Sequence, residues 1–166
     1  SGPGIHKWHH YFPIYAEAFS KFIGRKCHFA EVGVQSGGSL AMWKNVLGVD
    51  AHIYGVDISP HIKIFERPKS NVRTFIGNQT DRSFWQAFKK KVPILDMFLD
   101  DGGHEPNMMQ VTMEEVLPHL RPGGVYVVEN IHGGRNPFWR RMLDYFSGYL
   151  GGNRIAMQTW EGITLY

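Results

Sequence analysis

The stretch Phe29-Ala30-Glu31-Val32-Gly33-Val34-Gln35-Ser36-Gly37-Gly38-Ser39 decides the fold of this chain. An apolar segment runs into a glycine-rich turn, a helical pattern follows, and Asp57 ends the next apolar segment, which begins at Ile53. This order is typical of the first half of a nucleotide-binding α/β unit. Glycines let the backbone approach a ligand, and a carboxylate on the second strand accepts hydrogen bonds from ribose hydroxyls.

The glycine spacing indicates which nucleoside ligand to expect. A dinucleotide fold carries Gly-x-Gly-x-x-Gly and places a pyrophosphate on a helix N-terminus. Here three residues separate Gly33 from Gly37, and the acidic Glu31 lies inside the signature. A carboxylate at this place would repel a pyrophosphate, but it suits the cationic, amino-bearing tail of S-adenosylmethionine. The pattern therefore favours a methyltransferase that uses S-adenosylmethionine over a nicotinamide-dependent oxidoreductase.

Strand and helix patterns alternate along the chain, which predicts a mostly parallel sheet covered on both faces. Strands are expected at Phe29–Val34, His52–Asp57, Val72–Ile76, Ile94–Asp100 and Val125–Glu129. Helices are expected at Tyr11–Ile23, Ser39–Leu47, Ser83–Lys91, Met108–Leu120 and Pro137–Tyr149. Two last strands, Ile155–Trp160 and Ile163–Tyr166, predict an antiparallel hairpin with its turn at Glu161-Gly162. The expected fold is a Rossmann-like, doubly wound, seven-stranded sheet with this hairpin at one edge.

Composition limits the classes of protein to consider. The 166 residues are 43% hydrophobic, which fits one globular domain, expected over residues 6–166. Residues 1–5 are expected to be a disordered cloning remnant, because Ser1-Gly2-Pro3-Gly4 lacks an initiator Met. The net charge of +3 is scattered, so no nucleic-acid groove is predicted. The single Cys27 cannot form an internal disulfide. The sequence contains no run of 18 apolar residues, so no membrane-spanning helix is predicted. A cytoplasmic protein is expected.

Ligands of open α/β sheets lie beyond the carboxyl ends of the strands, so the polar residues there are the candidates for chemistry. His104 follows the fourth expected strand and is the candidate general base, since an imidazole is available neutral near pH 7. The alternative role for His104 is to cap the next helix. Asp101, Glu129 and Asn130 end neighbouring strands and offer oxygen ligands suited to Mg²⁺. Their alternative role is hydrogen bonding to loops and ligand without a metal.

A second group of residues is expected to bind the cofactor. Asn78 and Gln79 follow the third strand, where amide groups could read an adenine ring, whereas Asp81 is expected to cap the next helix. Ser39 either caps the helix after the glycine turn or faces the ligand, and Tyr15 could lie near the methionine tail. The full set of predicted cofactor contacts is Glu31, Gly33, Gly37, Gly38, Ser39, Asp57, Asn78, Gln79, Asp100 and Tyr15.

Five segments together resemble class I S-adenosylmethionine-dependent methyltransferases, in particular the branch of macrolide-sugar O-methyltransferases of mycinamicin and tylosin biosynthesis. They are Glu31–Leu40, Ile53–Asp57, Phe75–Gln79, Asp100–His104 and Leu120–Glu129, and the run Lys7-Trp8-His9-His10-Tyr11 with Tyr15 resembles the N-terminal motif of that branch. The resemblance implies that Asp101, Glu129 and Asn130 hold Mg²⁺ and that His104 and Asp101 act in catalysis.

The sequence departs from that branch at three positions: Asn130 and Asn78 stand for aspartates, and Gly103 stands for a serine. The loss of a negative charge at Asn130 weakens a site for a hard cation. The chain also lacks the insertions that enclose sugar substrates in relatives. We therefore expect an acceptor pocket that is either open or completed by a second subunit of a homo-oligomer or by a neighbouring domain.

The leading hypothesis is an O-methyltransferase that acts on a hydroxyl of a sugar or other small acceptor. The alternative from a different class is a catalytically decayed S-adenosylmethionine-binding module with a structural or regulatory role. The asparagine at position 130 favours this module slightly, whereas intact His104 and Asp101 argue against it.

Overall fold

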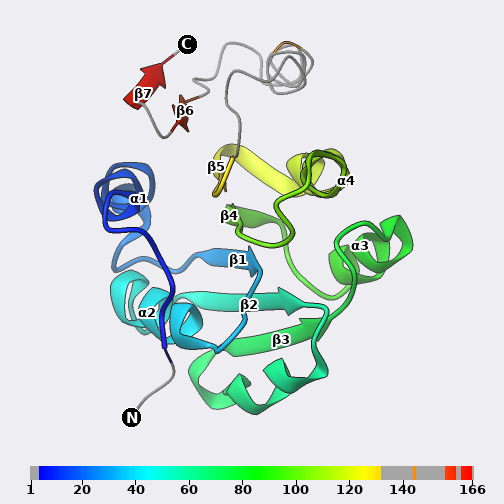
Figure 1. Ribbon diagram of the computed structural model, residues 1–166. Helices are drawn as coiled ribbons and strands as arrows, with labels where there is room; N and C mark the ends of the chain where they lie inside the picture. The colour runs from blue at the N-terminus through cyan, green and yellow to red at the C-terminus, as the bar shows by residue number, and fades with distance from the viewer. Residues whose placement is uncertain (1–3, 132–143, 145–155, 160–161, 166) are drawn as a thin grey trace.

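The computed structural model describes residues 4–131, 144, 156–159 and 162–165. Five strands form one parallel sheet in the order β3-β2-β1-β4-β5 (Figure 1). Their bounds are β1 His28–Val32, β2 His52–Asp57, β3 Val72–Ile76, β4 Leu95–Asp100 and β5 Leu120–Val128. The strand order reverses between β1 and β4. In sheets of this kind the ligand crevice lies outside the carboxyl ends of the strands at that point.

Helices cover both faces of the sheet, as Figure 1 shows. The α-helices are α1 Tyr11–Phe19, α2 Gly38–Leu47, α3 Arg82–Lys89 and α4 Pro106–Val116, and short 3-10 helices are η1 Ser20–Phe22, η2 Pro60–Phe65, η3 Pro68–Ser70 and η4 Leu117–His119. Alternate residues of each strand point to opposite faces. Phe29 and Ile53 pack with α1 and α2 in one core, whereas Ala30 and Tyr54 pack with α3 and α4 in the other.

The fifth strand differs from its prediction at its start. The sequence predicted a helix to Leu120 and a strand only from Val125, with 121–124 between the two elements, but β5 already begins at Leu120. Leu120 pairs with Leu95, and Val125 pairs with Met97. A bulge in the ladder therefore accommodates the extra residues, and Gly123 supplies the positive φ of 76° that this irregular backbone needs.

The chain's last described strands, β6 Ala156–Thr159 and β7 Gly162–Leu165, pair antiparallel as predicted. Within the described residues they form a sheet of their own and do not join β3 or β5. A single seven-stranded sheet with this hairpin at its edge therefore stays a prediction. The helix predicted at 137–149 lies outside the described residues apart from Asp144, which is helical.

Among the described residues, no helix combines the length and the apolar character that a membrane crossing requires.

Candidate functional site

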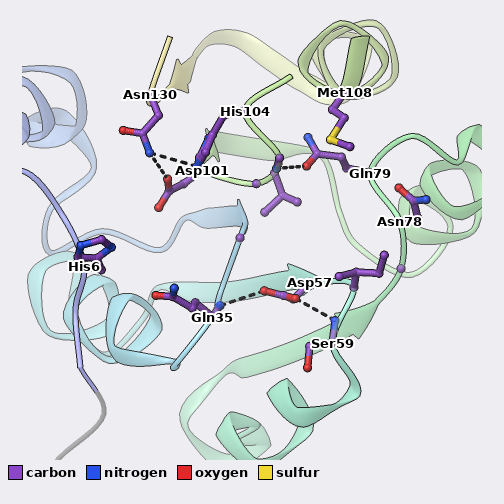
Figure 2. A pocket seen from close by; sticks show the side chains of 16 residues that line it. His6, Gln35, Asp57, Ser59, Asn78, Gln79, Asp101, His104, Met108 and Asn130 are labelled. Atoms are coloured by element: carbon purple, nitrogen blue, oxygen red, sulfur yellow. Dashed lines mark hydrogen bonds between the residues drawn. The ribbon is translucent and has the colours of Figure 1, made fainter. Parts of the chain in front are cut away.

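A cavity of about 570 Å³ opens at the carboxyl ends of the parallel strands (Figure 2). Its volume falls in the range of about 300–1,000 Å³ that small-molecule and cofactor sites occupy. The cavity is lined by His6, Val32, Gly33, Gln35, Asp57, Ile58, Ser59, Gly77, Asn78, Gln79, Asp101, Gly102, Gly103, His104, Met108 and Asn130. The segments after β1, β2, β3, β4 and β5 all contribute to it. This is the place that the strand order predicts for a ligand.

The glycine turn brings two strand ends into close contact. Gly33 has a φ of 96°, and a Cβ atom at this position would lie 1.8 Å from the backbone oxygen of Asp101. Only glycine fits both the conformation and this approach. Across the cavity the Asp57 carboxylate accepts hydrogen bonds from the backbone N–H groups of Gln35 and Ser59, each at 2.9 Å. These bonds hold one carboxylate at the end of β2 against the cavity.

Gln79 is a buried part of the cavity wall. Its side-chain nitrogen donates to Thr112 Oγ1 at 3.1 Å and to Asp100 Oδ1 at 3.4 Å, and its oxygen accepts from the backbone N–H of Gly103. Gln79 therefore ties the loop after β4 to helix α4. The neighbouring Asn78 also lines the cavity. Reading of an adenine ring by these two amides stays a prediction.

Asp100 ends β4 and lies below the cavity without lining it. Burial raises the pKa of Asp100 from 3.8 to about 7, although hydrogen bonds from Gly102, Gln79 and Tyr126 oppose that shift. Asp100 therefore supports the loop after β4 from beneath. Because Asp100 does not line the cavity, its predicted contact with the cofactor stays a prediction.

Asp81 was predicted to cap α3, whereas capping was one of two possible roles for Ser39 and for His104; α4 has Glu105 at its N-cap and no side-chain cap. Asp81 caps α3, because its Oδ1 accepts from the backbone N–H of Ser83 at 2.8 Å. Helix α2 instead has Gly37 at its N-cap and no side-chain cap. Ser39 is thus not a cap, and its hydroxyl donates to Glu31 Oε2 at 2.6 Å. Ser39 also lines a small cavity of about 20 Å³ beside the N-terminal segment.

Lys7, for which no role was predicted, lies at the centre of a group of three acidic side chains. Its Nζ donates to Glu31 Oε1 at 3.0 Å, to Asp101 Oδ2 at 2.7 Å and to Glu129 Oε1 at 2.9 Å. We call Glu31, Asp101 and Glu129 the carboxylate cluster. Tyr15, which was predicted to contact the cofactor, donates its hydroxyl to the same oxygen of Glu129.

Burial dominates the electrostatics of this cluster. It raises the pKa of Glu129 to about 7, although the charge of Lys7 opposes the shift, and it raises the pKa of Glu31 as well. Burial alone would lower the pKa of Lys7. The three carboxylates outweigh this effect and raise the pKa of Lys7 above its ordinary value, so Lys7 is an ammonium ion.

His104 and Asn130 meet at the rim of the cavity beside Asp101, as Figure 2 shows. The Tyr11 hydroxyl accepts from the backbone N–H of Asn130 at 3.1 Å and donates to Asn130 Oδ1 at 2.8 Å. This orientation directs Asn130 Nδ2 toward Asp101 Oδ1 and His104 Nε2, both at 3.3 Å. Because an amide nitrogen only donates and a carboxylate only accepts, Nε2 of His104 carries the lone pair in this arrangement.

The described arrangement does not fit a divalent cation. Two of the three predicted ligands, Asp101 and Glu129, already accept from Lys7, and the Asn130 oxygen accepts from Tyr11. In the described part of the chain, no three His, Cys, Asp or Glu side chains are arranged to hold a metal ion. The oxygen-rich composition of the site is the one that Mg²⁺ prefers, but an ammonium ion occupies its centre.

Half of the predicted site residues share the main cavity, namely Gly33, Asp57, Asn78, Gln79, Asp101, His104 and Asn130. Predicted residues that line neither cavity are Tyr15, Glu31, Gly37, Gly38, Asp100 and Glu129. Residues of the cavity wall that the prediction missed include His6, Gln35, Ser59 and Met108. The position of His6 and Lys7 directly before an aromatic-rich helix was the available signal for the N-terminal part of the site.

Residues 30–131, more than half of the chain, match the model of a family described as a methyltransferase domain. The mycinamicin VI 2''-O-methyltransferase of Micromonospora griseorubida is 31% identical over 130 residues, which cover 74% of this chain and 32% of that protein. The 8-demethyl-8-alpha-L-rhamnosyl tetracenomycin-C 2'-O-methyltransferase of Streptomyces olivaceus is 30% identical over 150 residues, covering 85% of this chain and 39% of that protein.

The fold also matches solved structures. MycE methyltransferase from the mycinamycin biosynthetic pathway, solved in complex with Mg, SAH and mycinamycin VI, superposes with a TM-score of 0.79 at 24% identity. That match covers 96% of this chain and 48% of the other. The present chain thus spans about a third of the length of the two curated relatives above and about half of the solved one.

Proposed function

Because the chain belongs to the family of methyltransferase domains, we propose that it transfers the methyl group of S-adenosylmethionine to a hydroxyl of a sugar or other small hydroxylated acceptor. Both curated relatives described above are named as O-methyltransferases of sugar-bearing natural products. Their names support the acceptor class, and the family match supports the type of reaction.

One observation carries this proposal: Asp57 and His104 lie on opposite sides of the same cavity (Figure 2). Asp57 ends β2, where a carboxylate can accept hydrogen bonds from the ribose hydroxyls of the cofactor. His104 lies beyond β4 at the other side, and Gly33, which also lines the cavity, follows β1, the strand between β2 and β4. A nucleoside held at Asp57 would thus present its reactive end toward His104.

S-adenosylmethionine carries the methyl group on a sulfonium. The acceptor oxygen must lie in line with the bond from sulfur to the methyl carbon, and its hydroxyl proton must be removed before or during the transfer. His104 Nε2 carries the lone pair and is the proposed base for the acceptor hydroxyl. As the acceptor oxygen forms its bond to the methyl carbon, the bond from that carbon to sulfur breaks and the proton passes to Nε2. Before the acceptor binds, Asn130 donates to the same nitrogen and orients the imidazole. The acceptor hydroxyl would replace this N–H as the donor to Nε2 before its proton is transferred. No step is assigned to a metal ion.

The acceptor would bind on the side of the cavity that His104 lines. Met108, on the first turn of α4, supplies an apolar wall beside the loop that carries His104. We propose that a second copy of the chain or a neighbouring domain completes the acceptor pocket. The proposed acceptors are hydroxylated sugars or natural products that carry them.

The test is the His104→Gln variant, measured for binding and for transfer separately. S-adenosylhomocysteine affinity, measured by calorimetry, should stay near wild type, because His104 does not face the nucleoside side of the cavity. Release of S-adenosylhomocysteine from S-adenosylmethionine with a panel of hydroxylated glycosides should fall by about 10²–10⁴-fold when the general base is lost.

The two other hypotheses give different results in the same experiment. A decayed binding module would bind S-adenosylhomocysteine without turning over any acceptor, and an oxidoreductase would bind NADH in its place. If His104→Gln loses cofactor affinity together with activity, His104 is a structural residue and the proposed role is wrong.

A further inference from the structure

Lys7 is almost completely removed from water, and its surroundings are acidic. Its side chain is 3% exposed, and the side chains of Glu31 and Glu129 are 0% and 3% exposed. The ammonium group has three N–H donors, and the three carboxylates each accept one of them at 2.7–3.0 Å. The hydrogen-bonding capacity of the ammonium is thus fully used within the carboxylate cluster.

A buried carboxylate without a cation is costly, so the cluster requires a positive charge. Two cations could supply it: the ammonium group of Lys7 and a divalent ion bound by Asp101 and Glu129. Lys7 occupies one oxygen of each carboxylate, Asp101 Oδ2 and Glu129 Oε1, and Asn130 donates to Asp101 Oδ1. A divalent ion at the remaining oxygens would lie within a few ångströms of the ammonium and would be repelled by it. They cannot occupy the cluster together.

The neighbouring residues are arranged for the ammonium. Asn130 presents its Nδ2 to Asp101, and an N–H donor in this position suits a carboxylate that is already paired with an ammonium but repels a metal ion. The Asn130 oxygen, which a metal would require, accepts from Tyr11 instead. Asn130 adopts a left-handed φ of 53°, a conformation that asparagine tolerates better than most residues.

We propose that Lys7 is the resident cation of the carboxylate cluster, so that a divalent ion binds there only when Lys7 has left. The N-terminal segment that carries Lys7 also supplies His6 to the wall of the main cavity. Displacement of Lys7 would therefore remove part of that wall. Lys7 is assigned here a positioning and charge-balancing role and not a chemical step.

The test uses Mn²⁺ as a spectroscopic probe and the Lys7→Met variant, which keeps the length of the side chain but removes its charge. Wild-type protein without cofactor should show weak Mn²⁺ binding by electron paramagnetic resonance. Lys7→Met should gain one site with an affinity raised about tenfold or more, within the range by which neighbours of metal ligands change affinity. Lys69→Met removes the same charge from an exposed position and should behave like wild type.

Equal Mn²⁺ affinities for wild type and Lys7→Met would overturn the proposal. Should Lys7→Met fail to fold, acetylation of the wild-type protein decides the question by mass spectrometry. Lys7 should react at least about tenfold more slowly than exposed Lys69, because it is buried and paired. Similar rates would show that the ammonium is not held in the cluster. Neither readout depends on methyl transfer, so the proposed function can fail or hold independently.

Discussion

At the scale of single residues, Asn130 determines how His104 is presented. Its amide is oriented by Tyr11 and donates to His104 Nε2 at 3.3 Å, which places the lone pair of the neutral imidazole on that nitrogen. The aspartate that the resemblance implies at this position could not donate. It would instead place a second carboxylate beside Asp101 and favour the imidazolium form of His104.

Asn130→Asp should therefore move the acidic limb of the pH–rate profile for methyl transfer to higher pH. The new carboxylate would stabilise a protonated imidazole, so a higher pH would be needed before the base can accept a proton. The matched control is Asn71→Asp, since Asn71 also has a left-handed φ, of 59°, but lies at the end of η3 away from the cavity. An unchanged profile for Asn130→Asp would show that the amide does not influence the base.

At the scale of elements, the segment before α1 is held by a contact that only glycine permits. A Cβ atom at Gly38 would lie 2.1 Å from the backbone oxygen of Gly4 and 2.8 Å from a side-chain carbon of Ile5. Gly38 is the first residue of α2, where alanine is the better helix former. Gly38→Ala should therefore leave the helix intact and push the N-terminal segment away from the glycine turn.

The expected result is faster tryptic cleavage after Lys7. Mass spectrometry measures this rate relative to cleavage after exposed Arg25, the internal reference. Gly4→Ala is the control on the other side of the contact, because its Cβ would meet its nearest neighbour, Ser36 Oγ, at an ordinary 3.8 Å. Cleavage after Lys7 that is equally slow in both variants would contradict an anchoring role for this contact.

The same segment shows why part of the site was missed. Strand and helix patterns are local, so the five strands and the helices between them could be predicted with ends shifted by a few residues, and the family match confirms the methyltransferase resemblance. Lys7 instead meets partners 24, 94 and 122 positions away along the chain. No periodicity reports such contacts. The sequence likewise predicted where Gln79 would lie. It did not predict that the amide nitrogen and the amide oxygen would both form hydrogen bonds within the protein.

At the scale of the whole molecule, a buried carboxyl group makes folding depend on pH. The ordinary pKa of Asp100 is 3.8, and burial raises it to about 7 in the native protein. Between these two values the native state keeps a proton that the unfolded chain has released. The contribution of Asp100 to the free energy of unfolding is therefore fully present below about pH 4 and is lost as the pH rises toward 7.

Asp100→Asn removes this titration while it keeps the size of the side chain. The free energy of unfolding of wild type minus that of the variant, measured by urea denaturation, should fall as the pH rises from 5 to 7. The slope should approach ~1.4 kcal/mol per pH unit, the limit for one proton. Taking the difference cancels the titration of groups that both proteins share, including His28 and His52. A difference that stays constant from pH 5 to 7 would mean that Asp100 is already ionised in the native protein, and that the hydrogen bonds from Gly102, Gln79 and Tyr126 outweigh its burial.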